Sequence, residues 1–184
     1  MKFSSKLAFV SFAVLLGLGA SSSFAQVAVG NSSMPVSRDI MDNVVSSKDH
    51  TTLVAGLKAA GLVDTLKGAG PFTFFAPTNA AFAALPAGTV DTLLKLENKG
   101  MLIGILTYHV VPGKVDTAAL TKMIMDGKGS TTFKTVAGGM LTAKSAGGKV
   151  IITDEKGGSS TVTIADVYQS NGVIHVVDKV LMPQ

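Results

Sequence analysis

The sequence contains neither cysteine nor tryptophan among its 184 residues. The absence of cysteine excludes disulfide scaffolds, thiol enzymes, thiolate zinc sites and lipid attachment through an amino-terminal cysteine. Charge is also scarce, since 15% of the residues are charged and a soluble domain usually has about 25%. The mean hydropathy of +0.43 therefore indicates either a membrane span or an apolar leader in front of a well-buried domain.

The first 25 residues have the three parts of a secretory signal. Lys2 and Lys6 make the amino end positive, residues 7–20 are apolar, and Ser23 to Ala25 provides small residues at the positions that signal peptidase reads. The apolar run is shorter than the ~20 residues that a spanning helix needs. We predict that residues 1–25 are cleaved, with an uncleaved anchor as the alternative. The protein is then exported, periplasmic or extracellular, without integral membrane association after cleavage.

The charges that remain after residue 25 do not favour nucleic-acid binding. Arg38 is the one arginine, and the lysines are scattered along the chain. Sequence-specific nucleic-acid binding relies on clustered basic residues and arginine forks. Residues 26–36 are small and polar without a period, which predicts a flexible leader, and residues 37–184 have the size of a single domain.

The patterning changes from helical to stranded along this domain. Apolar spacing and capping residues predict mainly helices before residue 120, with one buried strand, and strands separated by glycine turns after residue 130. The predicted helices are 40–45, 51–60, 62–66, 80–85, 90–96, 98–108 and a short one after Asp116, and the strands are 72–76, 131–136, 140–145, 150–154, 160–165 and 173–181.

Three ordered blocks make the sequence resemble the fasciclin domain family. They are residues 52–62 with 70–82, the segment Leu106 to Gly113, and residues 171–178 followed by Leu181-Met182-Pro183. The resemblance implies an α+β fold, a bent β-sheet sandwich or wedge with several helices packed on one side. It also implies an extracellular or cell-surface protein associated with adhesion and matrix interaction, with no general catalytic mechanism. A single domain with a signal looks like the small secreted bacterial members.

Two places are candidates for partner binding by this resemblance. The family's adhesion has been attributed to a segment around a Tyr-His pair, here Tyr108 and His109. His109 shares a helical face with Leu102, which predicts a buried, hydrogen-bonded histidine, so Tyr108 is the expected contact residue. Asp166 and Val167 occupy the position of an acidic-aliphatic pair linked to receptor binding in some relatives. A solvated loop aspartate is the alternative.

The other motif residues are expected to be structural. Burial beside backbone partners is predicted for His175, and a metal site formed with His109 would lack an identified carboxylate ligand. No nucleophile with a base, no carboxylate pair and no phosphate loop has recognisable spacing, so we expect no catalytic residues and no cofactor. The residues assigned structural roles are Pro77, Thr78, Asn79, His109, Pro112, Gly113, Asn171, Gly172 and His175.

These observations predict a secreted, non-enzymatic adhesion protein whose partner is a protein or polysaccharide of a cell surface or matrix. An alternative is a carrier of a small apolar, carotenoid- or lipid-like ligand, because some fasciclin-like proteins bind carotenoids and Met123 with Met125 would suit an apolar groove. A further alternative is a periplasmic structural or stress-related protein with a protein partner.

Overall fold

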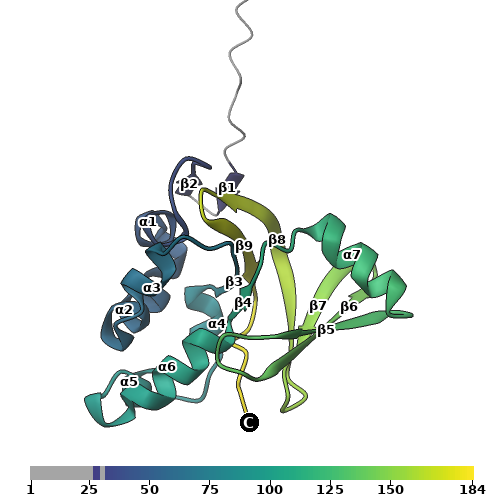
Figure 1. Cartoon of the computed structure of the whole chain (residues 1–184). Helices are drawn as coiled ribbons and strands as arrows, with labels where there is room; N and C mark the ends of the chain where they lie inside the picture. Colours follow the sequence, from purple (N-terminus) through teal and green to yellow (C-terminus); the bar gives the residue numbers. More distant parts are fainter. Residues whose placement is uncertain (1–26, 30–31) are drawn as a thin grey trace, which may run out of the picture.

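The computed structural model describes residues 27–29 and 32–184. It is an α+β fold, in which a bent seven-stranded sheet of order β4-β3-β9-β8-β7-β6-β5 is covered by helices (Figure 1). The predicted fold class is confirmed, whereas the predicted cleaved signal at 1–25 lies outside the described residues. The helices are α1 (Ile40–Ser46), α2 (Thr51–Ala60), α3 (Val63–Lys67), α4 (Asn79–Ala83), α5 (Thr89–Leu93), α6 (Lys99–Tyr108) and α7 (Thr117–Asp126), with 3-10 turns η1 (Lys48–His50) and η2 (Leu96–Asn98).

The sheet bends because its longest strand changes partners. β8 (Ser159–Gln169) pairs antiparallel with β7 at its beginning and with β9 along the rest of its length, with two register shifts between Val162 and Val167. The far ends of the sheet approach each other, since the Val136 N–H donates to the Val110 carbonyl at 2.8 Å. The sheet is therefore a nearly closed wedge. Its remaining strands are β3 (Phe72–Pro77), β4 (Val110–Pro112), β5 (Ser130–Lys134), β6 (Met140–Ala146), β7 (Lys149–Thr153) and β9 (Gly172–Val177).

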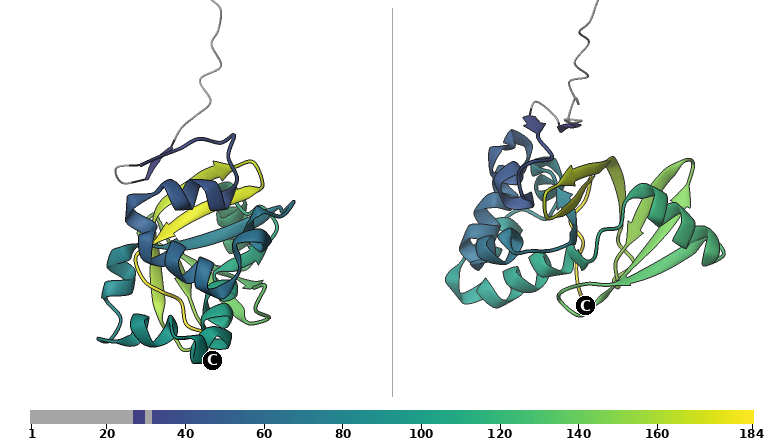
Figure 2. Two further views of the ribbon diagram at one scale, coloured as in Figure 1. Left: turned by 90° about the vertical axis from the view of Figure 1, so that its left-hand side faces the viewer. Right: turned by 45° about the horizontal axis from the view of Figure 1, so that its top comes forward.

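Two hydrophobic cores lie on the two faces of the central strands. Helices α1 to α6 form one layer beside β3, β9 and β4, while α7 lies apart from them over β5, β6 and β7 (Figure 2). In β3, Phe74 belongs to the core under the first layer and Phe75 to the core under α7. Every residue of β9 is buried, and β9 pairs parallel with β3. This largely apolar strand near the end of the sequence is thus covered on both sides, as parallel strands usually are.

Helix ends follow the predicted chemistry at three positions. Gly61 ends α2 with φ 74°, and the side chains of Thr78 and Asp116 accept hydrogen bonds from the first turns of α4 and α7. The start of α2 is capped differently. The Asn79 side chain accepts from the Thr52 N–H at 3.0 Å, so a residue distant in sequence caps this helix.

The predicted flexible leader at 26–36 is wrong for the part that the structure describes. β1 (Val27–Val29) and β2 (Ser32–Met34) pair antiparallel, and the side chains of Val29 and Met34 are buried in the core beneath the helices. Residues 26–36 are mostly small or polar and have no period, so the sequence does not indicate that Val29 and Met34 are buried. Their burial in the core holds the segment in place.

The predicted last strand is too long at its carboxyl end. β9 ends at Val177, and residues 178–181 leave the sheet, with Leu181 packed in the core under α7. The Leu181 N–H donates to the ring of His109 rather than to a strand. Apolar character here reflects burial without sheet pairing.

The turn between β8 and β9 joins three parts of the molecule. The Asn171 side chain accepts from the Ile40 N–H at 3.0 Å and donates to the carbonyls of Leu66 and Gly68 at 2.7 and 3.0 Å. Gly172 is required by close approach, because a Cβ there would lie 2.1 Å from the Phe72 carbonyl oxygen. The backbone of Gly172 does not have a positive φ, so close approach alone requires glycine here.

Replacing Asn171 with alanine should therefore destabilise the fold by about 2–4 kcal/mol, because three backbone groups of α1 and of the α3 end lose their partner. Urea unfolding measures this as a lower midpoint with an unchanged slope. Ser170→Ala is the matched control, since Ser170 is the exposed neighbour in the same turn. Equal stability of the two variants would contradict this role of Asn171.

Candidate functional site

His109 is a buried connector between α6 and the carboxyl-terminal segment. Its Nδ1 donates to the Ile105 carbonyl at 2.8 Å, and its Nε2 accepts from the Leu181 N–H at 3.0 Å. The side chain is 1% exposed, and burial lowers the pKa of His109 to about 4. The ring is therefore neutral at pH 7, in the buried state that its helical phase predicted.

Tyr108 is not on the surface, which corrects the expectation that it contacts a partner. Its side chain is fully buried, its hydroxyl donates to the Met140 carbonyl at 2.7 Å, and it accepts from the Glu155 N–H at 3.1 Å. A Cβ at Gly139 would lie 2.7 Å from the Tyr108 ring, so that glycine makes room for it. Tyr108 fastens the end of α6 to β6 and to the turn after β7.

Asp166 occupies the second register shift of β8 and has φ 57°. Its carboxylate oxygen Oδ1 accepts from the Thr117 N–H at the start of α7 at 2.7 Å, and its own N–H donates to Nδ1 of His175 at 3.3 Å. Non-glycine residues rarely hold a positive φ, and they do so where the surroundings fix them. Val167, the other member of the predicted pair, is fully buried, so its side chain is unavailable to a partner.

His175 supports this bulge from the middle of β9. Its Nε2 donates to the Val115 carbonyl at 2.8 Å, and its ring stacks on Phe75 with centroids 5.7 Å apart. Burial lowers the pKa of His175. Both ring nitrogens of His109 and His175 bind backbone groups, so a shared metal site would have to break at least two hydrogen bonds, one at each ring. The described residues include no group of three or more potential metal-binding side chains.

Polar side chains gather on the surface beside Asp166. Tyr168 lies two residues further along β8, and its hydroxyl donates to Oδ2 of Asp116 at 3.3 Å. Nζ of Lys114 lies 4.5 Å from the centroid of the Tyr168 ring. The Ala119 N–H bonded to Asp116 lowers the pKa of that carboxyl group. We call Lys114, Asp116, Asp166 and Tyr168 the α7-start cluster.

Sequence reasoning named Asp166 but missed the rest of this cluster as a surface. Asp166 with Tyr168, and Lys114 with Asp116, are each spaced two apart, a period that places side chains on one face of an extended chain. That spacing was the available signal. This spacing does not predict that residues 114–116 contact residues 166–168, which lie about 50 residues further along the chain.

The other motif residues support the backbone. The Gly113 N–H donates to the Pro71 carbonyl at 2.8 Å, and the Gly113 carbonyl accepts from the Thr73 hydroxyl at 2.7 Å. Pro77 ends β3 against Val177. Asn79 also donates from Nδ2 to the Lys48 carbonyl. These contacts explain the positions without assigning them to a partner.

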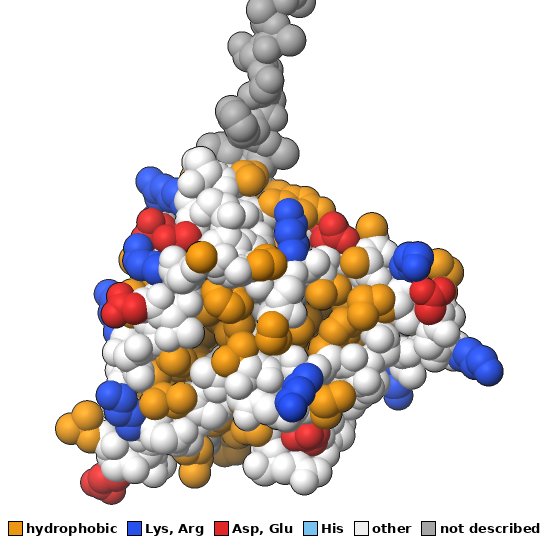
Figure 3. Space-filling model, viewed as in Figure 1, with side chains coloured by type: hydrophobic (Ala, Val, Ile, Leu, Met, Phe, Trp, Pro, Cys, Tyr) orange, Lys and Arg blue, Asp and Glu red, His pale blue; other side chains and the backbone are white. Residues whose placement is uncertain are grey.

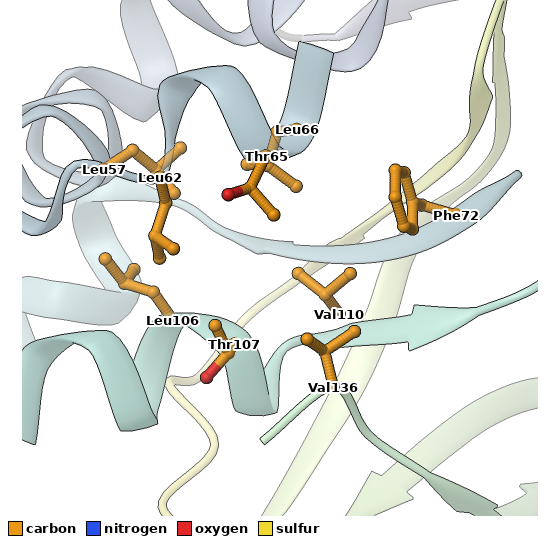
Figure 4. Close-up of a pocket in the computed structure, with 9 residues that line it drawn as sticks. All are labelled: Leu57, Leu62, Thr65, Leu66, Phe72, Leu106, Thr107, Val110 and Val136. Carbon is orange, nitrogen blue, oxygen red and sulfur yellow. The ribbon is translucent and has the colours of Figure 1, made fainter. Parts of the chain in front are cut away.

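A second candidate is an apolar groove between the helical layer and the edge of the sheet. In Figure 4, side chains of α2, α3 and the turn between them face those of α6, β4 and Val136 across it, with Phe72 of β3 at one end. The cavity volume is about 30 Å³, room for little more than a water molecule. On the face seen in Figure 3, apolar side chains form a band across the centre, with most charged side chains around it. The residues that line the apolar groove are Leu57, Leu62, Thr65, Leu66, Phe72, Leu106, Thr107, Val110 and Val136.

Comparison with known proteins identifies related sequences and a related fold. A family model described as Fasciclin domain matches residues 48–183. Protein sll1483 of Synechocystis is 49% identical over 144 residues, which cover 78% of this chain and 73% of that protein. Immunogenic protein MPB70 of Mycobacterium bovis is 36% identical over 143 residues, covering 75% and 65%.

Among solved structures, the FAS1 domain pair of the insect cell adhesion molecule fasciclin I matches with a TM-score of 0.71. The match is 19% identical and covers 85% of this chain and 57% of that chain, so it bears on the fold alone. Within residues 27–29 and 32–184, no helix has the length and hydrophobicity to cross a membrane.

The two tyrosines of the sequence should respond differently to loss of their hydroxyl groups. Tyr108→Phe should lower the free energy of unfolding by about 1–3 kcal/mol, because the Glu155 N–H and Met140 carbonyl lose a buried partner. Tyr168→Phe is the matched control and should change stability by less than about 0.5 kcal/mol. Urea unfolding of both variants checks this. A Tyr108→Phe protein as stable as the parent would contradict the role of the Tyr108 hydroxyl in holding α6 to β6.

Stability should also fall as the pH is lowered from about 6.5 towards 4. In that range an unfolded histidine binds a proton while folded His109, with a pKa of about 4, does not. The unfolded state therefore binds more protons, and acidification favours it by up to roughly 3 kcal/mol from His109. Burial also lowers the pKa values of His50 and His175, and these shifts act in the same direction.

Urea unfolding between pH 7.5 and 4 measures this dependence. His109→Gln should be less stable than the parent at pH 7.5 and should lose less stability on acidification. Parallel curves for the two proteins would show that His109 is not the group responsible.

Proposed function

Because this chain belongs to the fasciclin domain family, we propose that it is an exported, non-enzymatic protein that adheres to a component of a cell surface or extracellular matrix. The contact surface in this proposal is the α7-start cluster of Lys114, Asp116, Asp166 and Tyr168. The family membership supports an adhesion or interaction role in general. The partner, a protein or a polysaccharide, is the finer part of the proposal.

The observation that carries the proposal is the conformation of Asp166. A non-glycine residue with φ 57° in a strand costs free energy of order 1–3 kcal/mol. The hydrogen bonds to Thr117 and from its own N–H to His175 hold the residue there. Such strain concentrates at binding and catalytic sites, and this residue had been singled out by its sequence position.

The chemistry of the cluster suits recognition rather than catalysis. It combines a half-buried tyrosine ring, an exposed lysine and two half-buried carboxylates, which are groups that form hydrogen bonds and ion pairs at interfaces. Tyr108 has no place in this surface because it is buried. Of the two predicted contact places, the proposal keeps the one at Asp166 and drops the one at Tyr108.

The alternative of an apolar carrier has support in the groove of Figure 4, whose lining is almost wholly hydrocarbon. Its volume of about 30 Å³ is far below the 300–1,000 Å³ of ligand pockets, so a carotenoid-like ligand would require the helical layer to move away from β4. Met123 and Met125 lie on α7 and do not line it. Visible absorption and a lipid extract of the protein from its native source test this alternative, and a colourless, lipid-free preparation argues against it.

Adhesion is tested by binding of the purified protein to bacterial cells, host cells and matrix polymers in a surface assay. We expect retention of the parent protein and about tenfold weaker binding for Asp166→Asn and for Lys114→Gln, the loss expected of central interface residues. Asp166→Asn keeps an oxygen that can accept from the Thr117 N–H, so the fold should persist.

Asp91→Asn and Lys95→Gln are the matched controls, since both positions are exposed and lie on or just after α5. Failure of the parent protein to bind any of the three surfaces rules out adhesion. Equal weakening by all four variants would point to general charge effects and remove the α7-start cluster from the proposal.

A further inference from the structure

The partner change of β8 leaves a fork in the sheet. β7 pairs with β8 at three positions, the last being Ile151 with Thr161, although β7 itself begins at Lys149. Beyond Thr161, β8 follows β9 (Figure 1). The segment 162–165 of β8 therefore has no strand partner on the β7 side.

A cleft with a cavity volume of about 330 Å³ occupies this fork, and the first residue of α7, Thr117, lines it as well. Its volume is at the lower end of the range for small-molecule sites. The threonines Thr117, Thr161 and Thr163 and the exposed Lys149 supply polar groups, while Val150 and Ala165 are among the apolar residues that line it.

Thr117 has a hydroxyl group without a protein partner. Its Oγ1 is buried and is one of three buried side-chain polar atoms without a hydrogen bond among the described residues. Its N–H, by contrast, is bound by Asp166. A buried hydroxyl without a partner costs about 1–3 kcal/mol. Thr117 lines the cleft, so a ligand there could offset this cost if a small shift of the wall brought it to the buried Oγ1.

The charges around the fork restrict the class of ligand. The carboxylate of Asp166 accepts from the Thr117 N–H, and the carboxylate of Asp116 caps α7, the helix that Thr117 begins. These two negative charges beside the cleft disfavour an anion. Lys149 disfavours a cation. Threonine hydroxyl groups both donate and accept hydrogen bonds, and the valine and alanine side chains offer an apolar wall. A neutral ring that carries several hydroxyl groups and has C–H faces matches these features.

We infer that the fork between β7 and β8 is a binding site for one neutral sugar ring, with Thr117, Thr161 and Lys149 as its hydrogen-bonding residues. The site is distinct from the α7-start cluster. It goes beyond adhesion, because a soluble sugar can occupy it without any surface being present.

Titration of ¹⁵N-labelled protein with methyl glucoside, methyl galactoside and N-acetylglucosamine, followed by NMR, tests the site. At least one sugar should bind with a dissociation constant on the order of millimolar, as about a dozen ligand atoms at ~0.3 kcal/mol each imply. The amide shifts should centre on residues 117, 149–150 and 161–165. Thr161→Val and Lys149→Met should each weaken binding by about fivefold or more, whereas Thr142→Val and Lys144→Met on neighbouring β6 should not.

A second measurement separates binding from folding. Thr117→Val removes the orphaned hydroxyl, so it should leave the free protein equally stable or raise its midpoint of thermal unfolding by a few degrees, and should weaken sugar binding. No shifts at the fork with any neutral sugar at 50 mM would overturn the inference. Binding of glucuronate alone, or of a short extended peptide in place of sugars, would equally overturn it. Loss of adhesion with sugar binding intact would contradict only the proposed function.

Discussion

The structure depends most on the division of β8 between two partner strands. β8 pairs with β7 through residues 159–161 and with β9 through residues 162–169. Its register with β9 shifts between residues 162 and 167, and the sheet bends there into a wedge. The bend separates the core under α1 to α6 from the core under α7. It also creates the positive φ of Asp166 and the fork beside β7. The surface features with the most potential for binding are thus local consequences of how the sheet is closed.

In this chain without disulfides, hydrogen bonds from buried or half-buried side chains join backbone groups that are distant in the sequence. His109 joins α6 to the carboxyl-terminal segment, His175 joins β9 to the approach to α7, and Asn171 joins the last turn to α1 and α3. Each histidine uses one nitrogen as donor and the other as acceptor, which only the neutral ring can do. His109 and His175 thus connect segments that are distant in the sequence, as a disulfide would do in a chain that contained cysteine.

Helix ends could be predicted from the sequence, because a cap depends on neighbouring residues. The burial of a side chain between two different elements could not. Gly61, Thr78 and Asp116 marked helix ends because capping depends on a few adjacent residues. Tyr108 was misplaced because periodicity reports one buried face, and the end of α6 is enclosed by both the helical layer and β6.

The candidate site was only partly foreseeable for a related reason. Asp166 was found through the family resemblance, but Lys114 and Asp116 reach it only after the chain has folded back across about 50 residues. The fork required knowledge of where β7 and β8 stop pairing, and strand partners do not follow from alternation along one strand.

The position of β9 has a consequence for the order in which the molecule can form. This strand lies between β3 and β8 at the centre of the sheet, yet it comprises residues 172–177, and both cores contain its side chains. A chain that emerges amino end first from a ribosome or a translocation pore holds neither core closed until nearly all of it is out.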